Sequence, residues 1–366
     1  MIPPPVFLNG RFFSQSITGV QRFAAETTAA IDRLIADGEW PETTVLAPRV
    51  SRQGSGSGHD TTYERLSLKE VGRTSGHVWE QAELPMAARG GILVNLGNTA
   101  PLLAGSRQVV VIHDAGVFDT PESYSLQFRL WYRILQQRLV GVGAHVVTVS
   151  KFACGRIAEC LDIDPASIAV MYEGANHILR APADPGTLDR HGLVAGKFAL
   201  VVGTGAAHKN ITAIEQGASL LEQRGMMLAV AGSADPSLVY STNSNAGCIG
   251  RRLGRVTDAE LRALYESALC LLFPSRYEGF GLPPVEAMAC GCPVLASRGG
   301  AVEEICGDAA LYFSADDRRS MTDAIERLLD EEGLACDLRA RAIARAASFR
   351  WDVSARVLAG VVKQLQ

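Results

Sequence analysis

The chain has 366 residues, of which 47% are hydrophobic and 20% are charged, and its net charge is −4. This length suits two domains of similar size, and the composition is that of a globular enzyme rather than a disordered or fibrous protein. The small negative charge gives no electrostatic reason to expect a nucleic-acid partner. The sequence starts without the features of a signal peptide and has no stretch of roughly 20 apolar residues, so we expect a cytoplasmic protein.

Strand-like and helix-like runs alternate in the first half of the chain, which predicts a parallel sheet covered by helices on both faces. The predicted strands are 6–8, 44–47, 91–95, 108–112, 145–149 and 168–171, and the predicted helices are 20–36, 126–140 and 151–160. Residues 51–58, rich in Ser and Gly, are expected to form a flexible loop. The Pro-, Gly- and Asp-rich segment 178–186 is the expected interdomain linker.

The second half repeats the alternation, and we therefore predict a second Rossmann-like domain. Its predicted strands are 198–202, 226–231, 269–273 and 293–296, and its predicted helices are 210–223, 258–268 and 282–289. Residues 351–365 form a last amphipathic segment. The fold class is therefore α/β.

The segment 273–296 places two carboxylates, Glu278 and Glu286, around a glycine-rich turn that opens a helix. Glycines allow the chain to turn sharply there, and two prolines fit the first helical turn. The amides of the turn and the positive end of the helix dipole suit an anion such as a diphosphate; these amides belong to Gly279, Phe280, Gly281 and Leu282. Hydroxyls on either side of the phosphates could bond to the two carboxylates, which fits a ribose and a hexose.

This segment resembles the E-x7-E region of retaining family 4 glycosyltransferases, with the two glutamates at the same spacing. The resemblance continues in order over nearly the whole chain, at residues 16–22, 113–114, 148–150, 254–275 and 307–313. It implies the GT-B fold, in which two Rossmann-like domains face each other across a cleft and the C-terminal helix crosses back to the first domain. The implied domains are an acceptor domain, 1–180 with helix 350–366, and a nucleotide-sugar donor domain, 190–348.

Residues 18–22, 79–81 and 84–85 place the chain closest, within that family, to bacterial transferases of surface-polysaccharide assembly. Many of these resembled enzymes use GDP-mannose or a GDP-deoxyhexose. The resemblance therefore implies a GDP-linked donor.

The segment from Gly203 to Lys209 follows a predicted strand, so Lys209 could reach a phosphate. The resemblance implies that a basic pair here holds the donor diphosphate, although His208 stands where an arginine is frequent and Thr204 where some members carry another arginine. The alternative is a solvated lysine, but a lysine at a helix start opposes the helix dipole unless an anion is bound.

His113 and Asp114 end the apolar strand 108–112. The resemblance implies that His113 meets the donor sugar near its reacting carbon, where an imidazole can exchange a proton as charge develops. A purely structural histidine is the alternative. Asp114 either orients the imidazole or caps the next turn.

Gly19 is a further candidate for donor binding, and three other positions keep two interpretations each. Gly19, at the start of the first long helix, allows a close approach of phosphate or acceptor, and Arg22 is either an acceptor contact or a surface residue. Ser150 lies beside the expected cleft or caps a helix. Glu304 holds the nucleotide or simply favours a helix start.

The predicted helix 126–140 mixes arginines with large apolar side chains, namely Arg129, Arg133 and Arg138 with Phe128, Trp131 and Tyr132. Such a face could rest on anionic lipid headgroups at the inner face of the membrane, near a lipid-linked acceptor. The alternative is that the helix packs on its own sheet.

No metal site is predicted. The eight cysteines are expected to be reduced thiols, and Cys290 and Cys292 lack a second Cys/His pair at zinc-site spacing. Asp162 and Asp164 have the D-x-D spacing of metal-dependent glycosyltransferases of another fold, but Pro165 follows directly and favours a turn. We expect no cofactor beyond the nucleotide-sugar substrate.

The sequence thus predicts a retaining transferase that moves a hexose, mannose or a related deoxyhexose, from a nucleotide diphosphate sugar to a hydroxyl of a glycan or lipid-linked glycan. Glu286 is expected on the ribose, Glu278 on the hexose, and Lys209 on the leaving diphosphate. No carboxylate nucleophile is evident, which favours a same-face route, and a double displacement stays open. The alternatives are a nucleotide-sugar epimerase, another two-Rossmann enzyme such as a phosphorylase, and an inactive nucleotide-sugar-binding protein.

Overall fold

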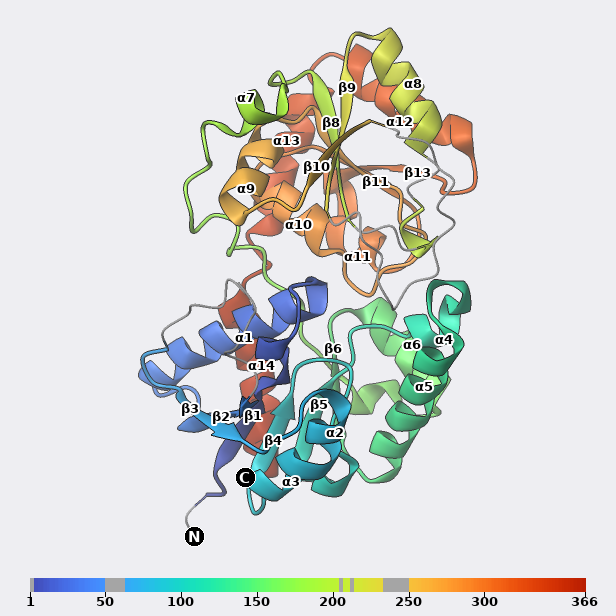
Figure 1. The fold of residues 1–366 in the computed structure, drawn as a ribbon. Coiled ribbons are helices and arrows are strands. Elements are labelled where there is room, and N and C mark those ends of the chain that lie inside the picture. Colours follow the sequence, from blue (N-terminus) through green and yellow to red (C-terminus); the bar gives the residue numbers. More distant parts are fainter. Residues whose placement is uncertain (1–2, 50–62, 204–206, 211–213, 233–249) are drawn as a thin grey trace. The chain divides into compact units, whose positions relative to one another are not determined.

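The computed structural model describes residues 3–49, 63–203, 207–210, 214–232 and 250–366 (Figure 1). The chain divides by its internal contacts into two compact units. Unit 1 consists of residues 1–115, 129–173 and 351–366, and unit 2 consists of residues 116–128 and 174–350. Neither unit is a single continuous segment.

Unit 1 is built on a seven-stranded parallel sheet in the order β3-β2-β1-β4-β5-β6-β7. Its strands are β1 Val6–Asn9, β2 Thr43–Pro48, β3 Ser67–Val71, β4 Ile92–Asn95, β5 Gln108–Val111, β6 His145–Thr148 and β7 Ala169–Val170. Strands β4 and β5 are buried along their whole length, which explains the apolar runs Ile-Leu-Val and Val-Val-Val within them. The strand order reverses between β1 and β4, so ligands are expected beyond the carboxyl ends of these two strands.

The helices of unit 1 are α1 Gly19–Ala36, α2 Gly76–Val78, α3 Leu84–Ala87, most of α5 Leu126–Gly141, α6 Lys151–Leu161 and α14 Trp351–Leu365. A short π-helix, Trp79–Glu83, joins α2 to α3. The C-terminal helix α14 lies against α1 (Figure 1). Phe23 and Trp351 meet edge to face with ring centroids 5.8 Å apart, and both side chains are fully buried. The predicted return of the last helix to the first domain is confirmed.

Unit 2 is built on a six-stranded parallel sheet in the order β10-β9-β8-β11-β12-β13. Its strands are β8 Phe198–Val202, β9 Met227–Ala231, β10 Arg251–Gly254, β11 Cys270–Phe273, β12 Val294–Ser297 and β13 Ala310–Phe313. Here the order reverses between β8 and β11. Two parallel Rossmann-like sheets confirm the predicted α/β fold class.

The helices of unit 2 are α4 Gly116–Asp119, the first residues of α5, α7 Thr187–His191, α8 Glu215–Gln223, α9 Asp258–Ser267, α10 Leu282–Ala289, α11 Val302–Cys306, α12 Arg318–Asp330 and α13 Leu334–Ala346. A capping box formed by Thr257 and Glu260 fixes the start of α9. One apolar core joins β8 and β11 to α12 through Val201, Leu272 and Ile325.

Several predicted boundaries shift. Residue Asn210 has φ +51°, a left-handed conformation that ends the 3-10 helix Ala207–Lys209, so the helix predicted from 210 is described only from Glu215. The expected loop 51–58 and Thr204 lie outside the described residues. Asp162 ends α6 in a left-handed conformation and Asp164 accepts from Ala166 N at 2.8 Å, both of which are turn geometries.

The cysteines of the described residues form no disulfide bond with one another. The seven cysteines in this part of the chain are free thiols, as predicted. Burial raises the pKa of Cys292 to about 12. Within the same residues, no helix combines the length and apolar character needed to cross a membrane.

Candidate functional site

The switch point of unit 2 brings together a lysine and a glutamate. Lys209 follows β8 and Glu278 follows β11, and these strands are neighbours in the sheet. Lys209 Nζ lies 2.6 Å from Glu278 Oε1, and their side chains keep 21% and 12% of their surface exposed. Lys209 Nζ also lies 5.7 Å from the centroid of the Phe273 ring. Two predicted site residues therefore form one charged pair that a ligand can still reach.

The loops that carry this pair are bonded to each other. Arg276 N donates to the backbone oxygen of His208 at 2.8 Å. Asn210 Nδ2 lies 3.3 Å from Pro274 O and 3.4 Å from Ala315 O, which its left-handed backbone allows. Asn210 was not among the predicted site residues. Asparagine is nevertheless a typical turn residue that tolerates the left-handed conformation, and here it directly follows Lys209.

Gly300, in the loop after β12, lies close against the backbone of Glu278. Gly300 has φ +61°, and a Cβ there would lie 2.6 Å from both the backbone N and O of Glu278. Ala301 N donates to Glu278 O at 3.0 Å. Only a glycine permits this approach and this φ together, so Gly300 fixes the backbone from which the Glu278 side chain projects.

Helix α10 begins directly after the glycine-rich turn. Gly281 has φ +102° and stands before the first helical residue, and Phe280 is buried against Phe349 with ring centroids 5.7 Å apart. Because prolines follow at 283 and 284, Leu282 is the one residue of the first three in α10 that has an N–H. The first turn of α10 therefore offers few free amides. Lys209 reaches Glu278, four residues before the helix begins.

Glu286 is buried on α10 and accepts two hydrogen bonds. His177 Nε2 lies 2.8 Å from Oε1, and the Tyr265 hydroxyl donates to Oε2 at 3.1 Å. Burial, with the charge of Glu286, raises the pKa of Tyr265 well above its usual value, so the phenol stays a donor. Sequence reasoning missed both partners because they are distant in the chain. A carboxylate oxygen has a second lone pair, so a ribose hydroxyl could still bond to Glu286.

The other candidates of unit 2 lie nearby in the fold. Gly203 N donates to Ala231 O at 3.0 Å at the ends of β8 and β9. The His208 ring stacks on Tyr124 with centroids 6.5 Å apart. Glu304 is half-buried on α11, and its backbone oxygen accepts from Arg345 Nη2 at 2.7 Å.

In unit 1, His113 is enclosed. Its Nε2 lies 3.1 Å from Leu96 O, its Nδ1 lies 3.4 Å from Glu173 Oε1, and Phe23 meets the ring edge to face at 4.5 Å. The His113 side chain is 7% exposed, so a sugar could reach its Nε2 only in place of the bond to Leu96 O. The role predicted for His113 at the donor sugar stays a prediction.

The remaining candidates of unit 1 are placed as follows. Gly19 is the first residue of α1, and a Cβ there would meet nothing within 4 Å, so its surface is open. Arg22 Nη1 lies 3.9 Å from Glu26 Oε1. Ser150 Oγ accepts from Ala153 N at 2.9 Å, as in a helix cap, and Asp114 is half-buried after β5.

Comparison with known proteins identifies the family. The family model of glycosyl transferases group 1 matches residues 191–349. O-antigen chain mannosyltransferase B of Escherichia coli is 32% identical over 261 residues, 67% of each chain, and O-antigen chain mannosyltransferase RfbU of Salmonella typhimurium is 28% identical over 271 residues, 69% of this chain and 70% of RfbU. The solved structure of sucrose-phosphate synthase from Thermosynechococcus elongatus has the same fold, with a TM-score of 0.72 at 17% identity over 99% of both chains. The chain therefore belongs to the group 1 glycosyltransferases.

Proposed function

We propose that this glycosyltransferase moves mannose or a related deoxyhexose, with retention of configuration, from a GDP-linked donor to a glycan hydroxyl during surface-polysaccharide synthesis. The observation that carries the proposal is the pair of Lys209 and Glu278 at the switch point of unit 2, beside the start of α10. Similarity to two O-antigen chain mannosyltransferases supports the mannosyl donor and the polysaccharide product.

The proposed reaction breaks the bond between the anomeric carbon and the β-phosphate oxygen. The acceptor oxygen forms its new bond to that carbon on the same face, and its proton passes to an oxygen of the leaving diphosphate. Lys209 and the amides from Gly279 to Leu282 stabilise the negative charge that develops on the diphosphate. The cation on Lys209 makes an obligatory metal unnecessary, so turnover should persist in a chelator.

The two glutamates would then hold the two sugars of the donor. Glu278 Oε1 is held by Lys209, which leaves Oε2 to accept from hexose hydroxyls. Glu286 would accept from the ribose through the lone pairs that His177 and Tyr265 leave open. Specificity would come from these hydroxyl contacts, since polar groups left unpaired by a wrong sugar are costly.

Transfer assays with GDP-mannose and p-nitrophenyl α-mannopyranoside test the proposal. We expect Lys209→Ala to lower kcat about 100- to 1000-fold, the range for loss of one group that stabilises transition-state charge. Glu278→Gln should raise the donor KM and lower kcat. Lys197→Ala removes an exposed lysine of the same unit and should leave both constants unchanged.

Two outcomes would overturn the proposal. Unchanged turnover of Lys209→Ala would refute the charge-stabilising role of Lys209. A β-linked product from the α-configured donor, detected by the coupling of the anomeric proton, would refute retention of configuration. UDP- and dTDP-sugars in a thermal-shift screen check the nucleobase, because a ligand that binds only the folded state raises Tm.

The proposal includes contact with a membrane surface through α5. Its exposed apolar residues Leu130 and Ile134 lie one turn apart, at 56% and 45% exposure, beside Trp131 at 39%. Arg133 and Arg138 are exposed on the same helix. An amphipathic helix of this composition suits anionic phospholipids at the inner face of the cytoplasmic membrane. Co-sedimentation with phosphatidylglycerol vesicles should be lost in a Leu130→Ser, Ile134→Ser variant and kept in wild type.

A further inference from the structure

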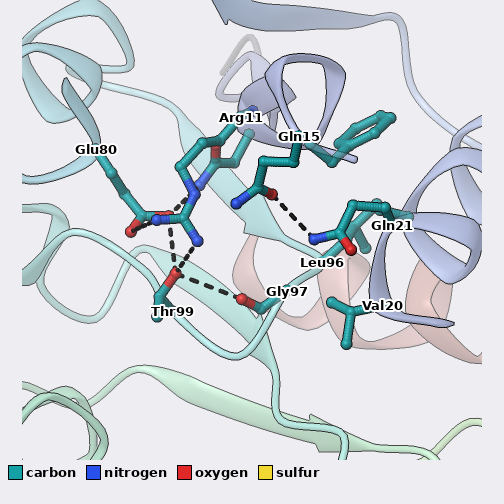
Figure 2. Close-up of a pocket in the computed structure, with 11 residues that line it drawn as sticks. Arg11, Gln15, Val20, Gln21, Glu80, Leu96, Gly97 and Thr99 are labelled. Carbon is teal, nitrogen blue, oxygen red and sulfur yellow. Dashed lines mark hydrogen bonds and ion pairs between the residues drawn. The ribbon is translucent and has the colours of Figure 1, made fainter. Parts of the chain in front are cut away.

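A polar hollow lies at the switch point of unit 1 (Figure 2). It is formed at the carboxyl ends of β1 and β4, the position where open parallel sheets bind ligands. The residues that line it are Asn9, Arg11, Phe12, Gln15, Val20, Gln21, Ala24, Glu80, Leu96, Gly97 and Thr99. The assignments made above for donor binding and catalysis use none of its polar side chains.

A buried ion pair forms one wall of the hollow. Arg11 Nη1 lies 3.1 Å from Glu80 Oε2, and the two side chains are 8% and 1% exposed. Arg11 Nη2 donates to Thr99 Oγ1 at 2.9 Å, and Asn9 Nδ2 donates to Glu80 Oε1 at 2.9 Å. Burying an ion pair costs desolvation energy, and apolar residues in the same place would avoid that cost. The position of this pair beside a hollow therefore indicates a role in binding rather than in stability.

The charges of the pair cancel. Arg11 and Glu80 are the only charged side chains among the described residues that line the hollow. Burial alone would raise the pKa of Glu80, but the hydrogen bond from His77 and the charge of Arg11 outweigh it and lower that pKa. Glu80 therefore stays ionised opposite the guanidinium. A hollow without excess positive charge suits neutral hydroxyls rather than a phosphate.

The opposite wall presents carboxamides. Figure 2 shows Gln15 and Gln21 side by side, with the amide nitrogen of Gln15 directed toward Arg11 and Glu80. Gln21 Nε2 donates to Gln15 Oε1 at 3.1 Å, and Gln21 Oε1 accepts from Thr18. The carboxamides supply both donors and acceptors, as a hydroxyl requires. The cavity volume is about 20 Å³, which holds one or two groups the size of a water molecule.

We propose that this hollow binds the hydroxyl-bearing edge of a neutral acceptor sugar, and that Gln15 and Gln21 with Arg11 determine which hydroxyl enters. This proposal rests on the proposed function for its acceptor. One hydroxyl or hydroxymethyl group fits the cavity, and the rest of the sugar ring stays outside. A phosphorylated sugar is rejected because, among the described residues that line the hollow, the one cation is Arg11, and its charge is balanced by Glu80.

The test measures binding without any donor, by NMR titration of the whole chain with methyl α-mannopyranoside, its four monodeoxy analogues and mannose 6-phosphate. We expect one deoxy analogue to bind about fivefold more weakly than the parent sugar, the effect of one lost hydrogen bond. Gln21→Ala and Gln15→Ala should each bind the parent sugar about fivefold more weakly than wild type does. In these variants the parent sugar and that deoxy analogue should bind with equal affinity. Gln127→Ala, an exposed glutamine of α5, is the matched control and should bind as wild type.

Equal binding of the parent sugar by wild type and both glutamine variants would overturn the proposal, as would tighter binding of mannose 6-phosphate. Lys209→Ala separates the two proposals, because it should lose transfer and keep sugar binding. Binding of the sugar without transfer from any donor would refute the proposed function alone. Transfer with an acceptor KM unchanged in Gln21→Ala would refute the hollow alone.

Discussion

The hydrogen bond from Tyr265 to Glu286 offers a sharp test of how the second glutamate is held. Tyr265→Phe removes a fully buried hydroxyl that donates at 3.1 Å to a carboxylate whose side chain is 8% exposed. A hydrogen bond to a charged group contributes about 1.5–3 kcal/mol. In a unit of this size, 1 kcal/mol shifts Tm by about 2–4 °C, so we expect the Tm of unit 2 to fall by about 3–12 °C.

Calorimetry of the whole chain would measure this shift, and Tyr312→Phe is the matched control. The Tyr312 hydroxyl donates at 2.7 Å to Gly307 O, a neutral acceptor, for which about 0.5–1.5 kcal/mol is expected. Tyr265→Phe should also weaken GDP binding, since Glu286 loses one of its two orienting donors, and Tyr312→Phe should not. Equal shifts of Tm in the two variants, with GDP affinity unchanged in both, would refute the reasoning.

Three further results are expected. Gly300→Ala should abolish transfer, because the new Cβ would lie 2.6 Å from the Glu278 backbone. The control Gly333→Ala also has a positive φ, +80°, but its Cβ would meet nothing within 4 Å, so this variant should keep transfer activity. Loss of transfer in both variants would show that backbone strain alone explains the effect. The pKa of Glu80 is lowered from 4.5, so the stability that Glu80 provides is fully present above this pH and is lost as the pH falls through the lowered pKa. Tm should therefore drop as the pH falls below 4.5 in wild type, and should drop less in Glu80→Gln. Iodoacetamide should label exposed Cys336 before buried Cys292, and mass spectrometry of the native protein would reveal the reverse order.

The buried parts of both sheets were predictable from sequence, because apolar runs such as β5 and β11 are needed wherever a strand has neighbours on both sides. The edge strands β3, β10 and β13 were missed, and β3 and β10 share a reason. They are largely exposed on their outer sides and carry the polar sequences Ser-Leu-Lys-Glu-Val and Arg-Arg-Leu-Gly, which have no strand pattern. Their pairing with β2 and β9 depends on tertiary contacts that a local pattern does not contain.

The candidate site also has parts that were predictable from the sequence and parts that were not. The glycine-rich turn and the helix after it were predicted to the residue, because Gly281 and the prolines at 283 and 284 specify local geometry. The partners of Glu286 were not predictable, since His177 lies 109 positions away and only the folded chain brings them together. Gly300 was missed for the same reason, as its contact with Glu278 joins loops after different strands.

The packing of α14 on α1 has a consequence for how the protein is made. Trp351 and Phe23 lie at opposite ends of the sequence, and Arg356 pairs with Glu39 at 2.7 Å. While the polypeptide is emerging from the ribosome, the apolar side of α1 stays uncovered until the final helix has been synthesised, after the whole of the second sheet. Chaperone capture of nascent chains is therefore expected to last until α14 has emerged from the ribosome and packed on α1.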